Sequence, residues 1–274
     1  MIIDSHQHLM LPTDSQLLKM EKAGVDKTIL FCTAPHPERA NNFEELKIEM
    51  GALYKILAGS NTKESNICRM KDNIKILVDV LNKYPNKFYG FCSVPLELSL
   101  QETKEWVEKY IIANGLKGVG EFTPGSDSQI RQLEPIFQVL TDFPQLPIWI
   151  HTFNPVTLNG IKILMELTLK YQKVSVIYGH MGGYHWMDVL DFAKTVPNVY
   201  IDLSAAFSTL AVRMAISELP ERCLYGSDAP YGEPLLSRQL IEIVSPSSEV
   251  SNKILGENIL KLIGDKNTKK ETED

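Results

Sequence analysis

Short apolar runs rich in β-branched and aromatic residues alternate along the chain with longer amphipathic stretches. Eight of the short runs have the length and composition of β-strands, and the apolar positions between them recur at helical spacing. The expected strands cover residues 2–5, 27–32, 88–94, 117–122, 148–152, 174–179, 199–203 and 223–225. The expected helices cover residues 14–22, 100–113, 129–140, 157–170, 185–195, 209–218, 235–244 and 251–263.

The connection after the second expected strand is longer than the others. It carries two helical patterns, residues 41–58 and 67–84, joined by the polar residues 59–64. Pro85 and Pro197 mark helix ends, because proline cannot continue a helix and restricts the residue before it. No glycine- or serine-rich linker divides the chain. We therefore expect a single domain over residues 1–264, a helical insertion at about 35–84, and a charged, frayed tail over 265–274.

Eight strand–helix units predict the class of fold. Strands that alternate with helices pair in parallel through helical crossovers. Eight units in 274 residues match an α/β fold of the (β/α)8 TIM-barrel type, whereas a doubly wound open sheet more often stops at about five to seven strands.

Composition and charge exclude several classes of protein. With 44% hydrophobic and 23% charged residues, the chain is neither disordered, collagen-like nor a coiled coil. Its 28 basic and 34 acidic residues give a net charge of −6, which argues against a dedicated nucleic-acid binder and favours a small-molecule substrate. No apolar run is long enough for a membrane helix, and the start lacks a signal-peptide pattern. Four widely spaced cysteines without a CxxC pair favour free thiols, so we expect a cytoplasmic protein.

Six polar residues interrupt or directly follow the expected strands. In a TIM barrel the carboxyl ends of the strands meet on one face, which is where chemistry takes place. An unpaired polar group at such a position is costly, so each of these residues needs a partner. They are His6 and His8 at the first strand, Glu121 at the fourth, His151 at the fifth, His180 at the sixth and Asp228 after the eighth.

This set of residues is typical of a metal centre. Residues two apart in an extended segment point to the same side, so His6 and His8 can face the barrel axis together. Imidazole with carboxylate suits Zn²⁺, Mn²⁺ or Fe²⁺, and a metal held in this way lowers the pKa of its bound water to about 7. Asp228 can bind the metal, accept a proton from that water, or do both, and His180 can orient the nucleophile or polarise the substrate.

Each residue also has a plainer interpretation. A single histidine at a strand end is often a hydrogen-bonded core residue. Asp228 alone could cap a helix, and Glu121 alone could be a buried ion-pair partner. The joint placement of the six residues at strands one, four, five, six and eight favours the metal centre.

At these residues the sequence resembles the amidohydrolase superfamily, specifically its amidohydrolase-related branch of TIM-barrel hydrolases and decarboxylases. The segments that carry the resemblance are IIDSHQH, LKGVGEF, IWIHT, VIYGHMGG, VYIDLSA and LYGSDAP, in this order along the chain. The resemblance implies a distorted TIM barrel that binds one or two divalent ions, usually zinc. It implies that His6, His8 and His151 are metal ligands, that His180 binds a second metal or assists catalysis, and that Asp228 is a ligand and proton acceptor.

Glu121 distinguishes subtypes within the family that the sequence resembles. Many two-metal members carry a carboxylated lysine at the end of the fourth strand, others carry a glutamate, and the decarboxylases generally need neither and use one metal. Glu121 is therefore similar to the glutamate of the bridged hydrolases. It could instead accept a hydrogen bond that fixes the tautomer of a ligand histidine.

The leading hypothesis is metal-dependent hydrolysis of a small ester, lactone or amide. The alternative is a metal-dependent non-oxidative decarboxylase or hydratase of an unsaturated or aromatic carboxylic acid. A metal-dependent deoxyribonuclease is less favoured, because that family typically has an acidic residue soon after the glutamate, and here Glu121 precedes Phe122-Thr123-Pro124-Gly125. A binding protein with an inert barrel is disfavoured by the presence of every expected ligand type.

Residues for substrate binding are harder to single out. Arg39 and Arg69, in and after the loop that follows the second strand, could bind a substrate carboxylate, although surface arginines are common. Phe153 and Tyr231 lie near strand ends and could form pocket walls or simply pack. Barrels of this kind often form dimers, so a homodimer is expected.

Overall fold

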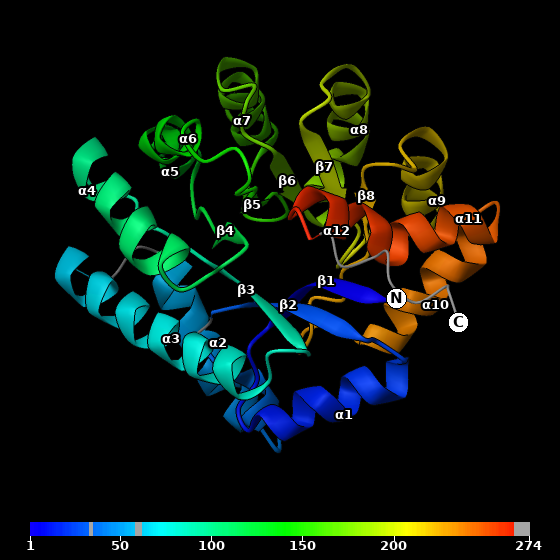
Figure 1. Ribbon diagram of the computed structural model, residues 1–274, viewed down its shortest axis with the longest axis horizontal. Coiled ribbons are helices and arrows are strands. Elements are labelled where there is room, and N and C mark those ends of the chain that lie inside the picture. Colours follow the sequence, from blue (N-terminus) through cyan, green and yellow to red (C-terminus); the bar gives the residue numbers. More distant parts are fainter. Residues whose placement is uncertain (33–34, 58–61, 266–274) are drawn as a thin grey trace.

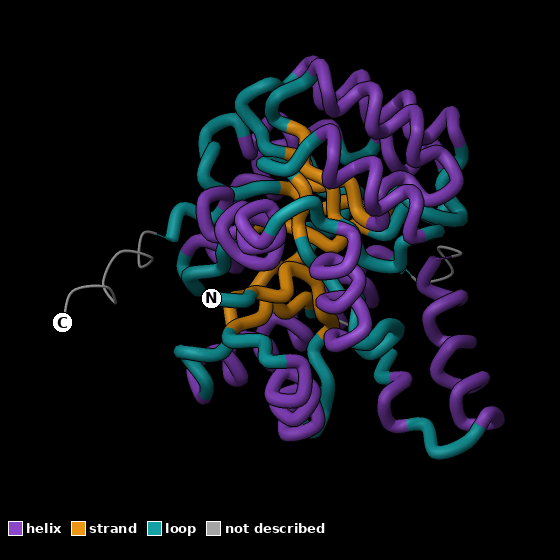
Figure 2. The backbone as a smooth tube through the Cα atoms, turned by 90° about the vertical axis from the view of Figure 1, so that its right-hand side faces the viewer, coloured by secondary structure: helices purple, strands orange, loops and turns teal. Residues whose placement is uncertain are grey.

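The computed structural model describes residues 1–32, 35–57 and 62–265. Within them, eight parallel strands pair in sequence order from the first to the eighth. Figures 1 and 2 show the strands at the centre and the helices around them. The strands are β1 (Ile3–His8), β2 (Lys27–Phe31), β3 (Phe88–Cys92), β4 (Gly118–Phe122), β5 (Ile148–His151), β6 (Val176–Gly179), β7 (Val199–Asp202) and β8 (Cys223–Leu224).

Backbone hydrogen bonds between the segment after β8 and β1 close the sheet into a barrel. Ser5 N donates to Tyr225 O at 2.8 Å, and His8 N donates to Ala229 O at 2.7 Å. In the reverse direction, Asp228 N donates to His6 O at 2.8 Å. The fold is therefore the expected (β/α)8 TIM barrel, and its eight strands lie where the apolar runs predicted them.

The helices largely follow the amphipathic stretches, including the insertion between β2 and β3. Serine and threonine residues begin several of them, as in the reciprocal capping of α4 by Ser99 and Glu102. The helices are α1 (Thr13–Ala23), η1 (Pro37–Arg39), α2 (Phe43–Leu57), α3 (Lys63–Lys83), α4 (Leu100–Trp106), η2 (Val107–Ile112), α5 (Asp127–Arg131), α6 (Glu134–Leu140), α7 (Leu158–Lys170), η3 (His180–His185), α8 (Trp186–Thr195), α9 (Thr209–Glu218), α10 (Pro234–Val244), α11 (Ser248–Asn252), η4 (Lys253–Glu257) and α12 (Asn258–Leu262).

Three expected helices differ from the prediction in their interior. The helix over 100–113 changes into a π-helix at Val107, and the one over 251–263 contains a π-helical stretch between α11 and α12. The helix over 129–140 is divided into α5 and α6, and Pro135, which lacks a backbone N–H, lies in the first turn of α6. Residues 58–61 of the insertion and 266–274 of the tail lie outside the described residues.

The interior of the barrel holds aromatic rings. The buried rings of Phe31, Phe91 and Trp149 pack against one another beneath His6, whose ring centroid is 4.3 Å from that of Trp149. Ile259 and Leu260 of α12 join the same cluster, and Figure 1 shows α12 lying across one end of the barrel. The opposite end, formed by the carboxyl ends of the strands, is the end at which TIM barrels place their functional residues. Among the described residues, no helix combines the length and the apolar content that crossing a membrane requires.

Gly179 at the end of β6 makes room for Trp149. A Cβ built on Gly179 would lie 2.0 Å from the indole ring. We therefore expect Gly179→Ala to lower the free energy of unfolding by about 1–3 kcal/mol through overpacking. Gly51 in α2 is the matched control, because a Cβ there meets nothing within 4 Å. Gly51→Ala should raise stability by about 0.5–1 kcal/mol, since alanine favours the helix. Urea unfolding of the two variants measures both, and equal effects would contradict this account.

Candidate metal centre

The six polar residues predicted at strand ends lie together at the carboxyl end of the barrel. His6 and His8 come from β1, Glu121 from β4, His151 from β5, His180 follows β6 and Asp228 follows β8. Each has a nitrogen or oxygen atom within 3.1–3.9 Å of another member of the group. The rings of His6 and His8 have centroids 5.2 Å apart, as expected for residues on the same side of the strand.

Glu121 lies between two pairs of imidazoles and is almost fully buried. Its Oε2 is 3.6 Å from His6 Nε2 and 3.4 Å from His8 Nε2. Its Oε1 is 3.2 Å from His151 Nδ1 and 3.9 Å from His180 Nε2. The two carboxylate oxygens therefore face different pairs of histidines, which is the arrangement that a bridging carboxylate requires.

The backbone fixes the position of Asp228. Its φ of 58° is in the left-handed region, and the residue is held there by the bond from its N–H to the carbonyl of His6. The carboxylate then reaches back to β1, where Oδ1 lies 3.1 Å from His8 Nε2 and 3.8 Å from His6 Nε2. This places a carboxylate that can exchange a proton beside the histidines of β1.

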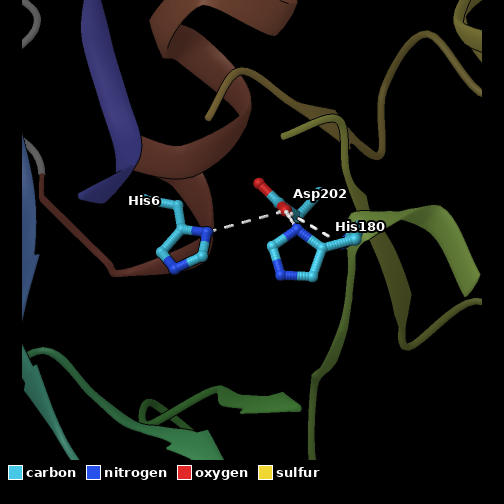
Figure 3. Close-up of side chains that lie close together, drawn as sticks. All are labelled: His6, His180 and Asp202. Atoms are coloured by element: carbon cyan, nitrogen blue, oxygen red, sulfur yellow. Dashed lines mark hydrogen bonds and ion pairs between the residues drawn. The ribbon is translucent and has the colours of Figure 1, made fainter. Parts of the chain in front are cut away.

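Asp202 and Ser204 support the centre, although neither was predicted from the sequence. Figure 3 shows the Asp202 carboxylate between His6 and His180, 3.8 Å from Nδ1 of each ring. The hydroxyl of Ser204 donates to Asp202 and lies 3.1 Å from His6 Nδ1 and 2.9 Å from His180 Nδ1. Both residues are fully buried. The signal that would have found Asp202 is the one used for the other six, a polar residue that ends an apolar strand.

These contacts determine which nitrogen of each ring faces the centre. Because the Ser204 hydroxyl proton is directed to Asp202, its oxygen is free to accept N–H bonds from Nδ1 of His6 and His180. A neutral imidazole that donates through Nδ1 has a lone pair on Nε2. In both rings that Nε2 is the nitrogen near Glu121. Ser204 and Asp202 thus orient two imidazoles as ligands toward the same carboxylate.

Charge interactions within the centre are strong. Burial opposes ionisation of Glu121, but hydrogen bonds from His151 and His180 outweigh it and hold the pKa of its carboxyl well below the usual value. Burial opposes protonation of His6, but Asp202 and Glu121 raise the pKa of that ring well above the usual value. An imidazole must be neutral to bind a metal, so loading this site releases protons and is weakened as the pH falls.

The residues present fit a divalent cation. His6 Nε2, the nitrogen near Glu121 and Asp228, is buried and has no hydrogen-bond partner among the described residues. Two groups have ligand atoms close enough to share an ion, one formed by His6, His8 and Asp228 and the other by Glu121, His151 and His180. The atoms of His6, His180 and Asp202 are equally close, but the Nδ1 atoms of the two histidines already contact Ser204, so we assign Asp202 to orientation.

Of the four residues expected at the substrate, Tyr231 is at the centre and the others are not. The Tyr231 ring meets His8 edge-on at a centroid distance of 5.3 Å. Phe153 instead lines a cavity of about 340 Å³ between the loops after β5 and β6, and none of the six residues of the centre is among the lining residues. Arg39 donates a hydrogen bond from Nε to the carbonyl of Leu11, and Arg69 donates one to the side-chain oxygen of Asn66. Their role in binding a substrate stays a prediction.

Glu38, in the segment after β2, contacts the loop that follows β1 and a neighbouring histidine. Glu38 Oε1 accepts from the N–H of Leu11 at 2.9 Å, and His36 Nδ1 lies 3.0 Å from the same oxygen. Burial chiefly raises the pKa of Tyr231, and the charges of Asp228, Glu121 and Glu38 add to it. Tyr231 therefore lies within electrostatic reach of both the centre and this segment.

Comparisons with known proteins agree with this architecture. A family model described as amidohydrolase matches residues 3–264, and no curated protein matches the sequence. Solved structures that resemble it include 2,6-dihydroxybenzoate decarboxylase from Rhizobium (TM-score 0.70, 17% identity, 96% of this chain and 98% of that chain). Another is 5-carboxyvanillate decarboxylase from Sphingomonas paucimobilis, with a TM-score of 0.70 and 14% identity over 96% of this chain and 98% of that chain. A third is dihydroxybenzoic acid decarboxylase from Polaromonas sp. JS666 with bound manganese and the inhibitor 2-nitroresorcinol. Its TM-score is 0.66, with 17% identity over 96% of this chain and 96% of that chain. At sequence identities of 14–17%, this structural similarity establishes a shared fold and nothing further.

Removing the support from His6 and His180 should weaken metal binding. We expect Asp202→Asn and Ser204→Ala to reduce the affinity for Mn²⁺ or Zn²⁺ by about 10–100-fold, because the Nδ1 contacts that orient both rings are lost. Ser204→Thr retains the hydroxyl and should restore most of the affinity. Calorimetric titration of the metal-free proteins with each ion measures the change.

The control is Ser208→Ala, which removes the side-chain cap of α9 and should cost about 1 kcal/mol of stability while leaving metal affinity unchanged. If Ser208→Ala weakened metal binding as much as Ser204→Ala, the effect would be one of general destabilisation and the orienting role would be refuted.

Proposed function

The chain belongs to the amidohydrolase family, and on this premise we propose that it is a divalent-metal-dependent decarboxylase of an aromatic carboxylic acid. The observation that carries the proposal is the likeness, over 96% of the chain, to decarboxylases of substituted benzoic acids. The cluster of four histidines and two carboxylates at the carboxyl end of the barrel supports it, because such a set can hold the ion that this chemistry needs.

The metal is proposed as a class rather than as one element. The family resemblance favours zinc, whereas two of the similar decarboxylase structures contain manganese. Imidazole nitrogen and carboxylate oxygen together suit either ion. A bound divalent ion would act as a Lewis acid that orients the oxygen atoms of the substrate and stabilises developing negative charge.

In this proposal the residues of the chain move the proton. When the carboxyl group leaves as CO2, the bond between it and the ring breaks, and the electron pair left on the ring carbon must take up a proton. Asp228 Oδ1, which lies 3.1 Å from His8 Nε2, can carry that proton. Asp228 is the partner placed to deliver it, because its carboxylate retains some exposure at the open end of the barrel.

Hydrolysis of an ester, lactone or amide is the second candidate, and the position of Glu121 favours it. Its two oxygens face different histidine pairs, as in a two-metal site bridged by a carboxylate. In that reaction Asp228 would accept the proton of the attacking water and pass it to the leaving group.

Product analysis separates the two candidates. Protein loaded with Mn²⁺ or Zn²⁺ is incubated with 2,6-dihydroxybenzoate and 5-carboxyvanillate, and separately with phenyl acetate and dihydrocoumarin. We expect CO2 and the decarboxylated aromatic product from the first pair. Asp228→Asn should lower kcat by about 10²–10⁴-fold, because a proton carrier is lost. Asp188→Asn, at an exposed position on α8, is the control and should retain full activity.

Acid release from the ester or lactone without CO2 from the benzoates would overturn the decarboxylase proposal and support hydrolysis. Full activity of Asp228→Asn on the benzoates would refute the proton-carrying role of that residue.

Metal content gives a second test that needs no substrate. For a one-metal decarboxylase we expect about one ion per chain in both the wild-type protein and Glu121→Gln, because His6, His8 and Asp228 form a ligand set without Glu121. Elemental analysis of the purified, metal-loaded proteins measures this, with Glu108→Gln at an exposed position of η2 as the control. About two ions in the wild type, falling to one in Glu121→Gln alone, would contradict the one-metal site and favour the bridged hydrolase.

A further inference from the structure

Two of the four cysteines lie side by side at the carboxyl ends of neighbouring strands. Phe31 of β2 is in register with Phe91 of β3, so Cys32 and Cys92, the next residues of the two segments, are also opposite each other. Adjacent strands are about 4.8 Å apart, which lies within the Cα separation that a disulfide bond spans. The two Sγ atoms are 2.6 Å apart, although the residues are 60 positions apart in sequence.

The two thiols differ in their surroundings. Cys92 is buried in the apolar layer between the barrel and the helices, and Cys32 packs against the same layer but is only partly buried. Burial and the neighbouring sulfur raise the pKa of the Cys92 thiol. A reagent from solvent therefore meets Cys32 first.

We propose that Cys32 and Cys92 form an oxidation site at which a hydroperoxide converts the two thiols into a disulfide bond between β2 and β3. The inference rests on strand register, sulfur contact and unequal exposure, and it is independent of the reaction that the metal centre performs.

The chemistry balances with a hydroperoxide as the oxidant. Cys32 sulfur attacks the outer oxygen of the peroxide, the O–O bond breaks, and the thiol proton passes to the leaving oxygen. The products are a sulfenic acid on Cys32 and an alcohol, or water when the oxidant is hydrogen peroxide. Cys92 sulfur then attacks the sulfenic sulfur, its proton leaves with the hydroxyl group as water, and the S–S bond forms. Two thiols are oxidised and one peroxide bond is reduced.

The pair lies at the rim of the metal centre. Ser93, the residue after Cys92, donates its hydroxyl proton to the carbonyl of Glu121 at 2.5 Å. A bond between Cys32 and Cys92 would therefore link β2 to the segment that holds the backbone of Glu121. The other two cysteines are internal controls for reactivity, because Cys68 is exposed on α3 and Cys223 is buried at β8.

The experiment treats the folded full-length protein with a small excess of hydrogen peroxide and maps the thiols. The protein is unfolded in acid with N-ethylmaleimide to prevent thiol exchange, digested, and analysed by mass spectrometry with and without dithiothreitol. We expect a peptide pair linked through Cys32 and Cys92 that is two hydrogens lighter than the reduced pair and that dithiothreitol separates. Cys68 and Cys223 should stay outside the link. Cys32→Ser, which leaves the buried thiol in place, should abolish it, and Cys68→Ser should not.

Retention of both thiols while Cys68 is oxidised would overturn the proposal. So would a link that forms equally in urea-unfolded protein, because the native strand register would then play no part. Links between chains through Cys68, without the pair from Cys32 and Cys92, would overturn it as well.

Discussion

Burial of three carboxylates at one end of the barrel is the constraint on which the site depends. Asp202 is fully buried, and the side chains of Glu121 and Asp228 are 7% and 12% exposed. Removing such charges from water is costly unless each is paired and hydrogen-bonded. The left-handed backbone at Asp228 and the hydroxyl of Ser204 both serve that pairing. A divalent cation would complete it, because it would compensate the carboxylates while the imidazoles remain neutral.

The fold and the six residues of the centre could be predicted from sequence because they obey strong local rules. Apolar runs of strand length recur eight times, and polar groups at their carboxyl ends meet in a barrel. The interruptions inside the helices were harder to predict from the sequence. The π-helical stretch after Trp106 preserves the amphipathic pattern of the helix it interrupts. Pro135 was visible, but a proline in the first turn fits the start of a helix as well as a break.

Asp202 and Ser204 were missed for a different reason. Their segment, VYIDLSA, had been recognised as part of the family resemblance, yet neither residue was assigned a task. Asp202 ends an apolar strand as the other six residues do, but the role of both residues at Nδ1 of His6 and His180 depends on ring orientations that the sequence does not show. The same holds for the choice of reaction. Hydrolysis was the leading hypothesis and decarboxylation the alternative, and because both use one ligand set, residue identity alone does not separate them. The function that we propose is the alternative, decarboxylation.

The tryptophan beneath the centre gives the barrel an optical property. Its indole lies 4.3 Å from the ring of His6 and 5.3 Å from that of His180, measured between centroids. A protonated imidazole close to an indole quenches its fluorescence, whereas a neutral ring quenches it far less. Trp106 and Trp186, on α4 and at the start of α8, contribute a background from the helical layer. We therefore expect the emission of Trp149 to fall when the nearer ring, that of His6, becomes protonated, which would give the barrel an optical reporter of its own.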